Sequence, residues 1–207
     1  MRKPKIRELK EALTSIFSRP YTAKFPAEAH VPFERFRGKP QFNPEKCVGC
    51  AACAIVCPAE AIKVEDIINK EGSKRILTHY SGICIFCGQC EANCIADKSG
   101  IKLTKEFDIA YFKQEEDCHC VEHELLVCSG CGKLIGAKKH LIWTIKKIGH
   151  LSFAQGTLLN INQEILEVKS EIDRKEVKKP LNRTDFFKIV CPQCRRESLL
   201  IDESIKS

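Results

Sequence analysis

Two runs of four cysteines with identical spacing constrain the fold of this chain more than any other feature. Each run reads Cys-x2-Cys-x2-Cys-x3-Cys. The runs consist of Cys47, Cys50, Cys53 and Cys57, and of Cys84, Cys87, Cys90 and Cys94. Strand-like segments are expected at Ala61–Glu65, Arg75–Tyr80 and Gly100–Thr104. An internal repeat of this kind predicts two copies of one small unit, packed about a pseudo-two-fold axis.

The spacing predicts two [4Fe–4S] clusters. Three cysteines on a tight loop reach three corners of one cube, and the fourth ligates the other cluster in two-cluster ferredoxins. The predicted ligands are therefore Cys47, Cys50, Cys53 and Cys94 for cluster one, and Cys84, Cys87, Cys90 and Cys57 for cluster two. Zinc is the alternative, but zinc sites use pairs of Cys-x2-Cys units and give the third cysteine of each run no role.

The residues between these cysteines suit such clusters. Gly49 and Gly88 are expected to let the backbone turn and to bring N–H groups toward sulfur. Most of the other loop residues are apolar, and a dry shell with N–H donors holds a cluster and sets its potential. Pro58 follows the first run, as the motif expects, whereas Ile95 follows the second. This departure does not affect ligation, because proline is not a ligand.

Two further cysteine pairs lie near the C-terminus. They are Cys128 with Cys131 and Cys191 with Cys194, expected after strand-like segments at Leu125–Val127 and Phe186–Val190. Four thiolates would close a tetrahedral structural zinc site. The pairs are far apart for a zinc ribbon, so the helical insertion between them is expected to loop out, with a helix at Ala137–Ile148. Rubredoxin-like iron and surface thiols in an unstructured tail are the alternatives.

The segment Cys118-His119-Cys120 is open to several interpretations. It could replace one of the C-terminal pairs, bind a separate metal, form a redox-sensitive pair, or contain two buried thiols without a chemical role, which is the interpretation we favour. Three histidines are expected to be structural or exposed, because no second ligand is spaced with them: His123, His140 and His150.

These features predict an α+β chain in three parts. Residues 1–41 form an N-terminal amphipathic helix and an extended docking arm, residues 42–110 a dicluster ferredoxin domain, and residues 111–207 a zinc-ribbon-like cysteine-knuckle domain with a helical insertion. The helix is predicted from apolar residues at helical spacing before Pro20: Ile6, Leu9, Leu13, Ile16 and Phe17. The prolines that follow exclude a helix as far as residue 46.

Composition narrows the class of protein. Fourteen cysteines without a secretory signal or an apolar run of spanning length indicate metal binding in a reduced, cytosolic-type compartment. The formal net charge is +7, with the excess concentrated in the first 46 residues, and such an arm suits nucleic acid, anionic lipid or an acidic protein. We find no phosphate loop, Ser/His/Asp arrangement or dinucleotide fingerprint, so the chain is expected to transfer electrons without a catalytic site of its own.

Three sequence stretches resemble a known family. Phe36-Arg-Gly-Lys-Pro, Cys47-Val-Gly-Cys-Ala-Ala-Cys and Cys84-Ile-Phe-Cys-Gly-Gln-Cys-Glu are similar to the two-cluster subunit of respiratory complex I. They are closer to the matching subunit of membrane-bound group 4 [NiFe] hydrogenases, which include formate hydrogenlyase. Residues 33–110 contain this similarity. The formate hydrogenlyase version also has a cysteine-rich extension ending in a knuckle that Cys191-Pro-Gln-Cys194 resembles.

The resemblance implies an electron-transfer subunit at the cytoplasmic side of the cell membrane, bound peripherally. Its partners would be an upstream electron-donor subunit and the small [NiFe] hydrogenase-like subunit. The N-terminal helix would lie near the membrane arm, so contact with the membrane is indirect, and no nucleic acid is expected. Three alternatives remain open at this point: a complex I quinone-reductase subunit, a free dicluster ferredoxin, and a redox-sensing protein that binds nucleic acid.

Overall fold

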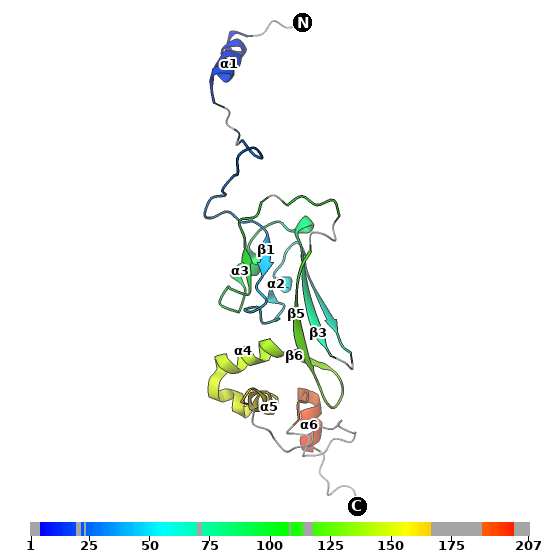
Figure 1. The fold of residues 1–207 in the computed structure, drawn as a ribbon. Helices are drawn as coiled ribbons and strands as arrows, with labels where there is room; N and C mark the ends of the chain where they lie inside the picture. Colours follow the sequence, from blue (N-terminus) through cyan, green and yellow to red (C-terminus); the bar gives the residue numbers. More distant parts are fainter. Residues whose placement is uncertain are drawn as a thin grey trace, which may run out of the picture. The chain divides into compact units, whose positions relative to one another are not determined.

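The computed structural model describes residues 5–19, 22, 24–69, 72–107, 109–113, 118–166 and 188–200. The chain divides into two compact units, Met1–Phe36 and Arg37–Ser207. We describe each unit by itself (Figure 1).

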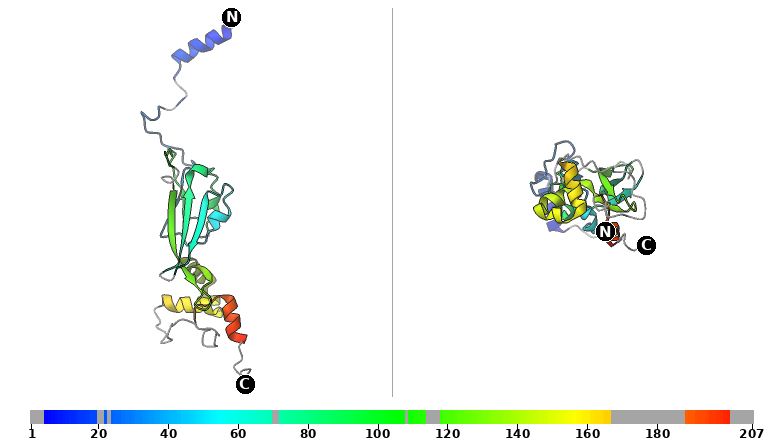
Figure 2. Two further views of the ribbon diagram at one scale, coloured as in Figure 1. Left: turned by 90° about the vertical axis from the view of Figure 1, so that its right-hand side faces the viewer. Right: turned by 90° about the horizontal axis from the view of Figure 1, so that it is seen from below.

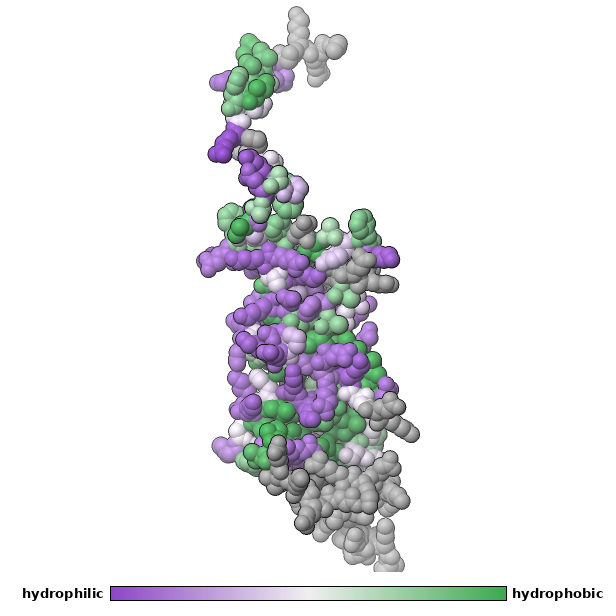
Figure 3. Space-filling view, in the orientation of Figure 1, coloured by the Kyte–Doolittle hydropathy of each residue, from purple (hydrophilic) through white to green (hydrophobic). Residues whose placement is uncertain are grey.

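The N-terminal unit contains one helix, α1 (Ile6–Phe17), which confirms the helix predicted near the N-terminus. Its first turn is closed by Lys5, whose backbone N–H donates to the Glu8 carboxylate at 3.0 Å. None of its residues is buried, and the apolar side chains are visible on its surface in Figure 3. Pro20, where the helix was predicted to stop, lies outside the described residues. The docking role of the arm remains a prediction.

The second unit contains two antiparallel sheets. The smaller sheet pairs β1 (Pro40–Phe42) with β4 (Ile101–Leu103). The larger one has the strand order β2-β3-β5-β6. Its strands lie side by side in Figure 2 and have the bounds Ile62–Ile67, Lys74–Tyr80, Cys118–Val127 and Leu134–Ala137. The three strands predicted within the repeat are thereby confirmed.

The two cysteine runs fold alike, as the repeat predicts. A single helical turn lies inside each run, α2 (Ala52–Ile55) in the first and α3 (Gln89–Ala92) in the second. Left-handed backbone recurs at corresponding positions of the two copies, with φ between 51° and 79°, in the pairs Gly49 and Phe86, Ala51 and Gly88, and Glu60 and Asp97.

Strand β5 joins the C-terminal segment to the ferredoxin part of the chain. It pairs with β3 along its length, from Lys74 opposite Glu124 to Tyr80 opposite Cys118. The strand predicted at Leu125–Val127 is therefore the end of a ten-residue strand. The sheet continues across the predicted boundary between residues 110 and 111, which itself remains a prediction.

Helices follow the sheet toward the C-terminus. The helix predicted at Ala137–Ile148 is found as α4 (Lys138–Ile148), and a 3-10 helix, η3 (Gly149–Ala154), leads to α5 (Gly156–Ile165). The predicted strand at Phe186–Val190 is wrong where it is described, because residues 188–190 are not a strand. They lead instead into α6 (Pro192–Leu200). Pro192 occupies the first helical position, where its missing N–H and fixed φ favour a helix.

The insertion between the two C-terminal cysteine pairs packs back against the second pair. Thr157 on α5 donates its hydroxyl to the carbonyl of Val190 at 2.8 Å, and Asn160 donates its amide to the carbonyl of Lys188 at 3.0 Å. The expectation that the insertion loops out is therefore wrong as far as residue 166. These bonds hold the backbone that leads into Cys191.

The core of the second unit includes the cysteines themselves. Buried apolar residues from both sheets pack with three cysteines of the two runs: Phe42, Ile62, Leu77, Ile101, Val121, Cys47, Cys53 and Cys90. A second buried cluster consists of Cys128, Val190, Cys191 and Cys194. Small cores of this kind gain much of their stability from bound metal centres.

Candidate metal centres

The first candidate site is a cavity lined by Cys57 together with all but the last cysteine of the second run. The lining thiols are Cys57, Cys84, Cys87 and Cys90. The remaining walls are mostly apolar and include Pro40, Ile62 and the buried side chain of His79. The fourth cysteine of one repeat therefore shares a cavity with three cysteines of the other.

Backbone donors point at the sulfurs of this cavity. The N–H of Ala61 donates to Cys57 Sγ at 3.3 Å, and the N–H of Phe86 donates to Cys84 Sγ at 3.4 Å. The left-handed conformation of Phe86, with φ of 52°, belongs to the turn that aims its N–H at that sulfur. Thiolates bound to iron accept such hydrogen bonds, so the cavity fits a [4Fe–4S] cluster in both donor set and polarity.

The second candidate site gathers the rest of the eight cysteines. Cys47 and Cys53 are buried, while Cys50 and Cys94 are half-buried. Gly100 marks the point where the repeats meet, because a Cβ there would lie 3.1 Å from Cys94 Sγ and 3.2 Å from Cys47 Cα. The last cysteine of the second run thus lies next to the first cysteine of the first run.

The buried thiols of both sites resist ionisation. Burial raises the pKa of Cys53 to about 12, and neighbouring cysteines, Cys47 and Cys50 first among them, add to the shift. Burial likewise raises the pKa of Cys90 to about 11. Thiols of this kind become thiolates at neutral pH only when a cation offsets the cost of desolvation. Iron supplies that charge, so these residues fit a metal centre.

His123 on β5 contacts the second site, a contact that we did not predict. Its Nε2 lies 3.3 Å from Cys47 Sγ, and its side chain is 3% exposed. Burial lowers the pKa of His123, and Lys139 and Arg75 lower it further. The alternation of exposed and buried positions along β5 could have indicated that His123 faces inward. It places His119, His123 and two apolar residues on one face of the strand.

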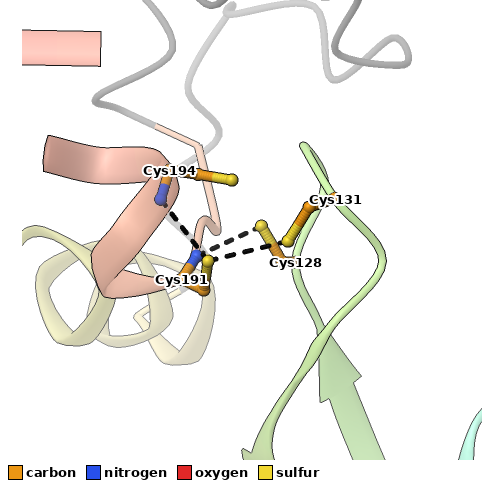
Figure 4. Close-up of side chains that lie close together, drawn as sticks. All are labelled: Cys128, Cys131, Cys191 and Cys194. Carbon is orange, nitrogen blue, oxygen red and sulfur yellow. Dashed lines mark hydrogen bonds between the residues drawn. The ribbon is translucent and has the colours of Figure 1, made fainter. Parts of the chain in front are cut away.

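The third candidate site is formed by the C-terminal cysteines. The four sulfurs of Cys128, Cys131, Cys191 and Cys194 all lie within 4.8 Å of one another. The first pair lies in the turn between β5 and β6 and the second at the start of α6, and the side chains converge in Figure 4. Zinc–sulfur bonds of about 2.3 Å in a tetrahedron place the sulfurs about 3.8 Å apart. Cys131 Sγ and Cys191 Sγ are 3.7 Å apart.

Backbone N–H groups also point at the sulfurs of the third site. Burial opposes ionisation of Cys128, but N–H groups of Cys191, Cys131 and Gly130 outweigh it and lower its pKa to about 7. The N–H of Cys191 lies 3.2 Å from Cys128 Sγ. One thiolate is therefore available near neutral pH to begin binding a metal ion, and the bound cation would favour ionisation of the others.

The segment Cys118-His119-Cys120 lies on β5 apart from these sites. Both cysteines are exposed, so the expectation that they are buried thiols is wrong. The His119 ring stacks on Phe42 with centroids 5.9 Å apart. In the described part of the chain, neither cysteine belongs to a group of ligand atoms close enough to share one metal ion. Of the other histidines, His140 is half-buried and His150 is exposed.

Comparisons with known proteins agree with this geometry. The fold and the two sets of cysteines define a ferredoxin-type iron–sulfur protein, and residues 46–98 match the family model described as a 4Fe-4S dicluster domain. In the residues that the structure describes, no helix is both long and apolar enough to cross a membrane.

Relatives narrow the class to a family. The chain is 37% identical over 119 residues to NADH-quinone oxidoreductase subunit I 2 of Geobacter metallireducens, an alignment that covers 55% of this chain and 89% of that protein. It is 38% identical over 101 residues to NAD(P)H-quinone oxidoreductase subunit I of Gloeobacter violaceus, covering 47% of each, so it spans about half the length of that relative. The chain belongs to the subunit I family of NADH-quinone oxidoreductases.

A third relative matches more of the chain. Formate hydrogenlyase subunit 6 of Escherichia coli is 29% identical over 181 residues, which cover 87% of this chain and 84% of that protein. An alignment of this length necessarily includes most of the segment after residue 110. The alignments with the two quinone oxidoreductase subunits cover 55% and 47% of the chain.

Proposed function

We propose that this chain is an electron-transfer subunit that relays electrons through two [4Fe–4S] clusters in a membrane-associated, formate hydrogenlyase-type oxidoreductase. The observation that carries the proposal is the shared cavity of Cys57 with three cysteines of the second run. Cluster one is assigned to Cys47, Cys50, Cys53 and Cys94, and cluster two to Cys84, Cys87, Cys90 and Cys57.

Each cluster, when bound, accepts and returns one electron at a time. The residues of the chain fix the position of the clusters, exclude water and supply N–H groups to the sulfurs. The crossed cysteines tie each cluster to both repeats, because Cys57 extends from the first repeat and Cys94 from the second. A rigid pair of this kind keeps the distance between the clusters constant during transfer. All eight thiols are used in ligation, so neither cluster keeps a free iron for substrate chemistry.

The formate hydrogenlyase branch is favoured over a quinone-reducing complex by the segment after residue 110. The alignment with formate hydrogenlyase subunit 6 extends through most of that segment. The partners in this proposal are an upstream electron-donor subunit and a small [NiFe] hydrogenase-like subunit. The exposed apolar face of α1 supports docking to a larger assembly, since a freely diffusing carrier has no use for it. The proposed location is the cytoplasmic face of the cell membrane.

The third site is proposed to hold a structural zinc ion. Four sulfurs within 4.8 Å and the 3.7 Å separation of Cys131 and Cys191 support a tetrahedral ion. Replacing Cys131 with alanine should remove one zinc per chain, measured by mass spectrometry of metals, and leave the iron content unchanged. Cys120→Ala is the matched control, because that thiol is exposed and apart from the site. Iron in this site, or an unchanged zinc content in Cys131→Ala, would contradict the assignment.

An anaerobic pull-down tests the function. The tagged full chain is isolated from mildly solubilised membranes, and the proteins that accompany it are identified by mass spectrometry. The proposal expects hydrogenase-type subunits and an electron-donor subunit. Quinone-module subunits instead would assign the chain to a complex I relative. Recovery of the chain alone, in soluble form and with its iron, would support a free ferredoxin.

A variant in α1 tests the docking role of the helix. Replacing both Leu9 and Leu13 with serine removes the centre of the apolar face but no cluster contact, because neither side chain is buried. The co-purifying subunits should be lost while the iron content stays the same. Replacing the charged Lys10 with serine is the control on the same helix and should retain them.

A further inference from the structure

We propose that His123 donates a hydrogen bond to Cys47 Sγ and thereby raises the reduction potential of cluster one. The inference rests on the proposed ligands of cluster one and deepens that assignment. It starts from the 3.3 Å separation between His123 Nε2 and Cys47 Sγ, in a side chain that is 3% exposed.

The direction of the hydrogen bond follows from the chemistry of the two groups. A thiolate bound to iron has no proton and can only accept, so the ring has to present its N–H at Nε2. The other ring nitrogen, Nδ1, is buried and has no hydrogen-bond partner in the described part of the chain. A proton placed on Nδ1 would be a buried donor without an acceptor, which is unfavourable. Both considerations select the tautomer that donates to sulfur.

Gly49 supplies the space for the imidazole. A Cβ at this position would lie 2.8 Å from His123 Cγ and 2.9 Å from Cδ2, closer than side chains pack. The left-handed backbone alone does not require glycine here, because Phe86 adopts the same region at the corresponding position of the second repeat. The histidine ring, rather than the turn, is therefore what requires glycine at position 49.

The loop that faces the ring is also held in place by the neighbouring strand. His123 stands opposite Arg75 in the pairing of β5 with β3, and Arg75 Nη1 donates to the carbonyl of Gly49 at 2.9 Å. The loop that contains Cys47 is thus held against β3 by a side-chain hydrogen bond that is independent of the imidazole. A loop held in this way keeps Cys47 Sγ beside the imidazole N–H, which is the geometry that tunes a metal centre from outside its ligands.

A hydrogen bond to a ligand sulfur affects the two oxidation states differently. The added electron increases the negative charge on the thiolates, and a donor stabilises the reduced state more than the oxidised one. Removing the donor should therefore make cluster one harder to reduce and shift its potential to a more negative value. Cluster two should not respond, because the cavity that contains its cysteines is lined by other residues.

The test is a redox titration of the full chain, reconstituted anaerobically and followed by low-temperature EPR. His123→Phe keeps a ring without an N–H, and His123→Gln keeps an N–H donor. His119→Phe is the matched control on the same face of β5, because its ring stacks on Phe42 and a phenyl ring preserves that contact. The signal of cluster one is identified as the one that is lost in Cys50→Ser.

The expected result is a negative shift of the cluster-one signal in His123→Phe, with a smaller shift in His123→Gln and none in His119→Phe. ENDOR of the original chain should show a proton coupled to cluster one whose signal is lost on exchange into D2O. This exchangeable signal should be absent in His123→Phe. Unchanged potentials in His123→Phe, or an equal shift of both clusters, would overturn the inference. If His123→Phe does not assemble cluster one, His123→Gln decides: a potential near that of the original chain supports the inference, and a failure to assemble overturns it.

Iron and sulfide contents show whether a negative result contradicts only the role of His123 or also the proposed function. An unmodified chain with about eight irons keeps the two-cluster proposal intact even if every histidine variant has unchanged potentials. An unmodified chain without iron would remove the proposed function and the inference together.

Discussion

The surroundings of the two proposed cluster sites differ although the same cysteine motif builds both. The cluster-one loop is covered by the segment after residue 110, through His123 and Ala137 against Gly49 and through Lys139, which donates to the carbonyl of Pro44 at 2.8 Å. The cavity of cluster two has no lining residue beyond Cys90 in the described part of the chain. Ile85, on its wall, is 63% exposed.

This difference shows how a repeat acquires asymmetry. The motif fixes the backbone of both copies, down to left-handed residues at corresponding positions. What lies outside each loop is decided by later segments of the chain, and the pairing of β5 with β3 places His123 beside Cys47. Two clusters with the same ligands therefore meet different hydrogen bonds and different exposure to water, which are factors that set reduction potentials.

The largest effect is expected from Cys57→Ala. This change removes a cysteine of the first run but should abolish cluster two, leaving cluster one with its four ligands. Iron and sulfide should fall to about half, and one of the two EPR signals should disappear. Cys120→Ala should retain both clusters, because that thiol is exposed on β5. Loss of cluster one with retention of cluster two would show that the ligands are not crossed.

Replacing Gly49 with alanine should damage cluster one selectively. The added Cβ would lie 2.8 Å from the His123 ring, and the residue would keep a φ of 73°. Strain of this kind costs about 1–3 kcal/mol. The corresponding change in the other repeat, Phe86→Ala, adds no atom and should leave both signals in place. Anaerobic urea denaturation followed by EPR measures how easily each variant loses its clusters. Equal losses of cluster signal in Gly49→Ala and Phe86→Ala would contradict the proposed difference between the two loops.

Arg75→Ala should have a moderate effect on stability near cluster one. Its Nε and Nη2 bind the two oxygens of Asp66 at 2.7 and 2.8 Å, and its Nη1 binds the carbonyl of Gly49. Loss of these partly buried bonds should lower the free energy of unfolding by about 1–3 kcal/mol. Urea denaturation followed by circular dichroism measures this, with Lys63→Ala on the neighbouring strand as an exposed control.

The stability contributed by the pairing of Asp66 with Arg75 should not depend on pH between about 6 and 8. Hydrogen bonds from Arg75 lower the pKa of Asp66 despite an opposing effect of burial. A lowered carboxyl pKa contributes stability that is fully present above the ordinary value of about 3.9 and is lost only as the pH falls through the lower one. In addition to burial, Arg75 lowers the pKa of His123 and of His140, so Asp66→Asn, which leaves Arg75 in place, is the variant that isolates the pair. A loss of stability in Asp66→Asn that shrinks from pH 8 to pH 6 would contradict this source of stability.

The smallest effect is expected from Lys139→Ala. The hydrogen bond from Lys139 to Pro44 lies at the exposed edge of the cluster-one loop. Its loss should lower the free energy of unfolding by about 0.5 kcal/mol or less and leave the EPR signals unchanged. A large loss of cluster one in this variant would mean that α4, rather than β5, holds the loop in place.

The features that could be predicted from the sequence are the local ones. The spacing of the cysteines sets which thiols share a loop, so the repeat and its strands follow from the order of residues, whereas the single helical turns α2 and α3 were not predicted. Helix α4 was also predicted from the sequence, at Ala137–Ile148. The strand predicted before the second cysteine pair is wrong at residues 188–190, because these residues lead into α6, which begins at Pro192.

The features that escaped prediction depend on contacts between distant segments. His123 meets Cys47 only because β5 pairs with β3, and nothing in the spacing of either residue indicates that pairing. Thr157 bonds to Val190 through the same kind of long-range packing. The alternation of β5 could have shown that His123 faces inward, but not which sulfur it reaches.

The central claim is that this chain holds two [4Fe–4S] clusters, and the most direct measurement is low-temperature EPR of the reduced full chain combined with a count of its metals. The account predicts about eight irons per chain and the signals of two reduced clusters that interact magnetically. Zinc in place of iron at the eight cysteines, with no EPR signal after reduction, would contradict it.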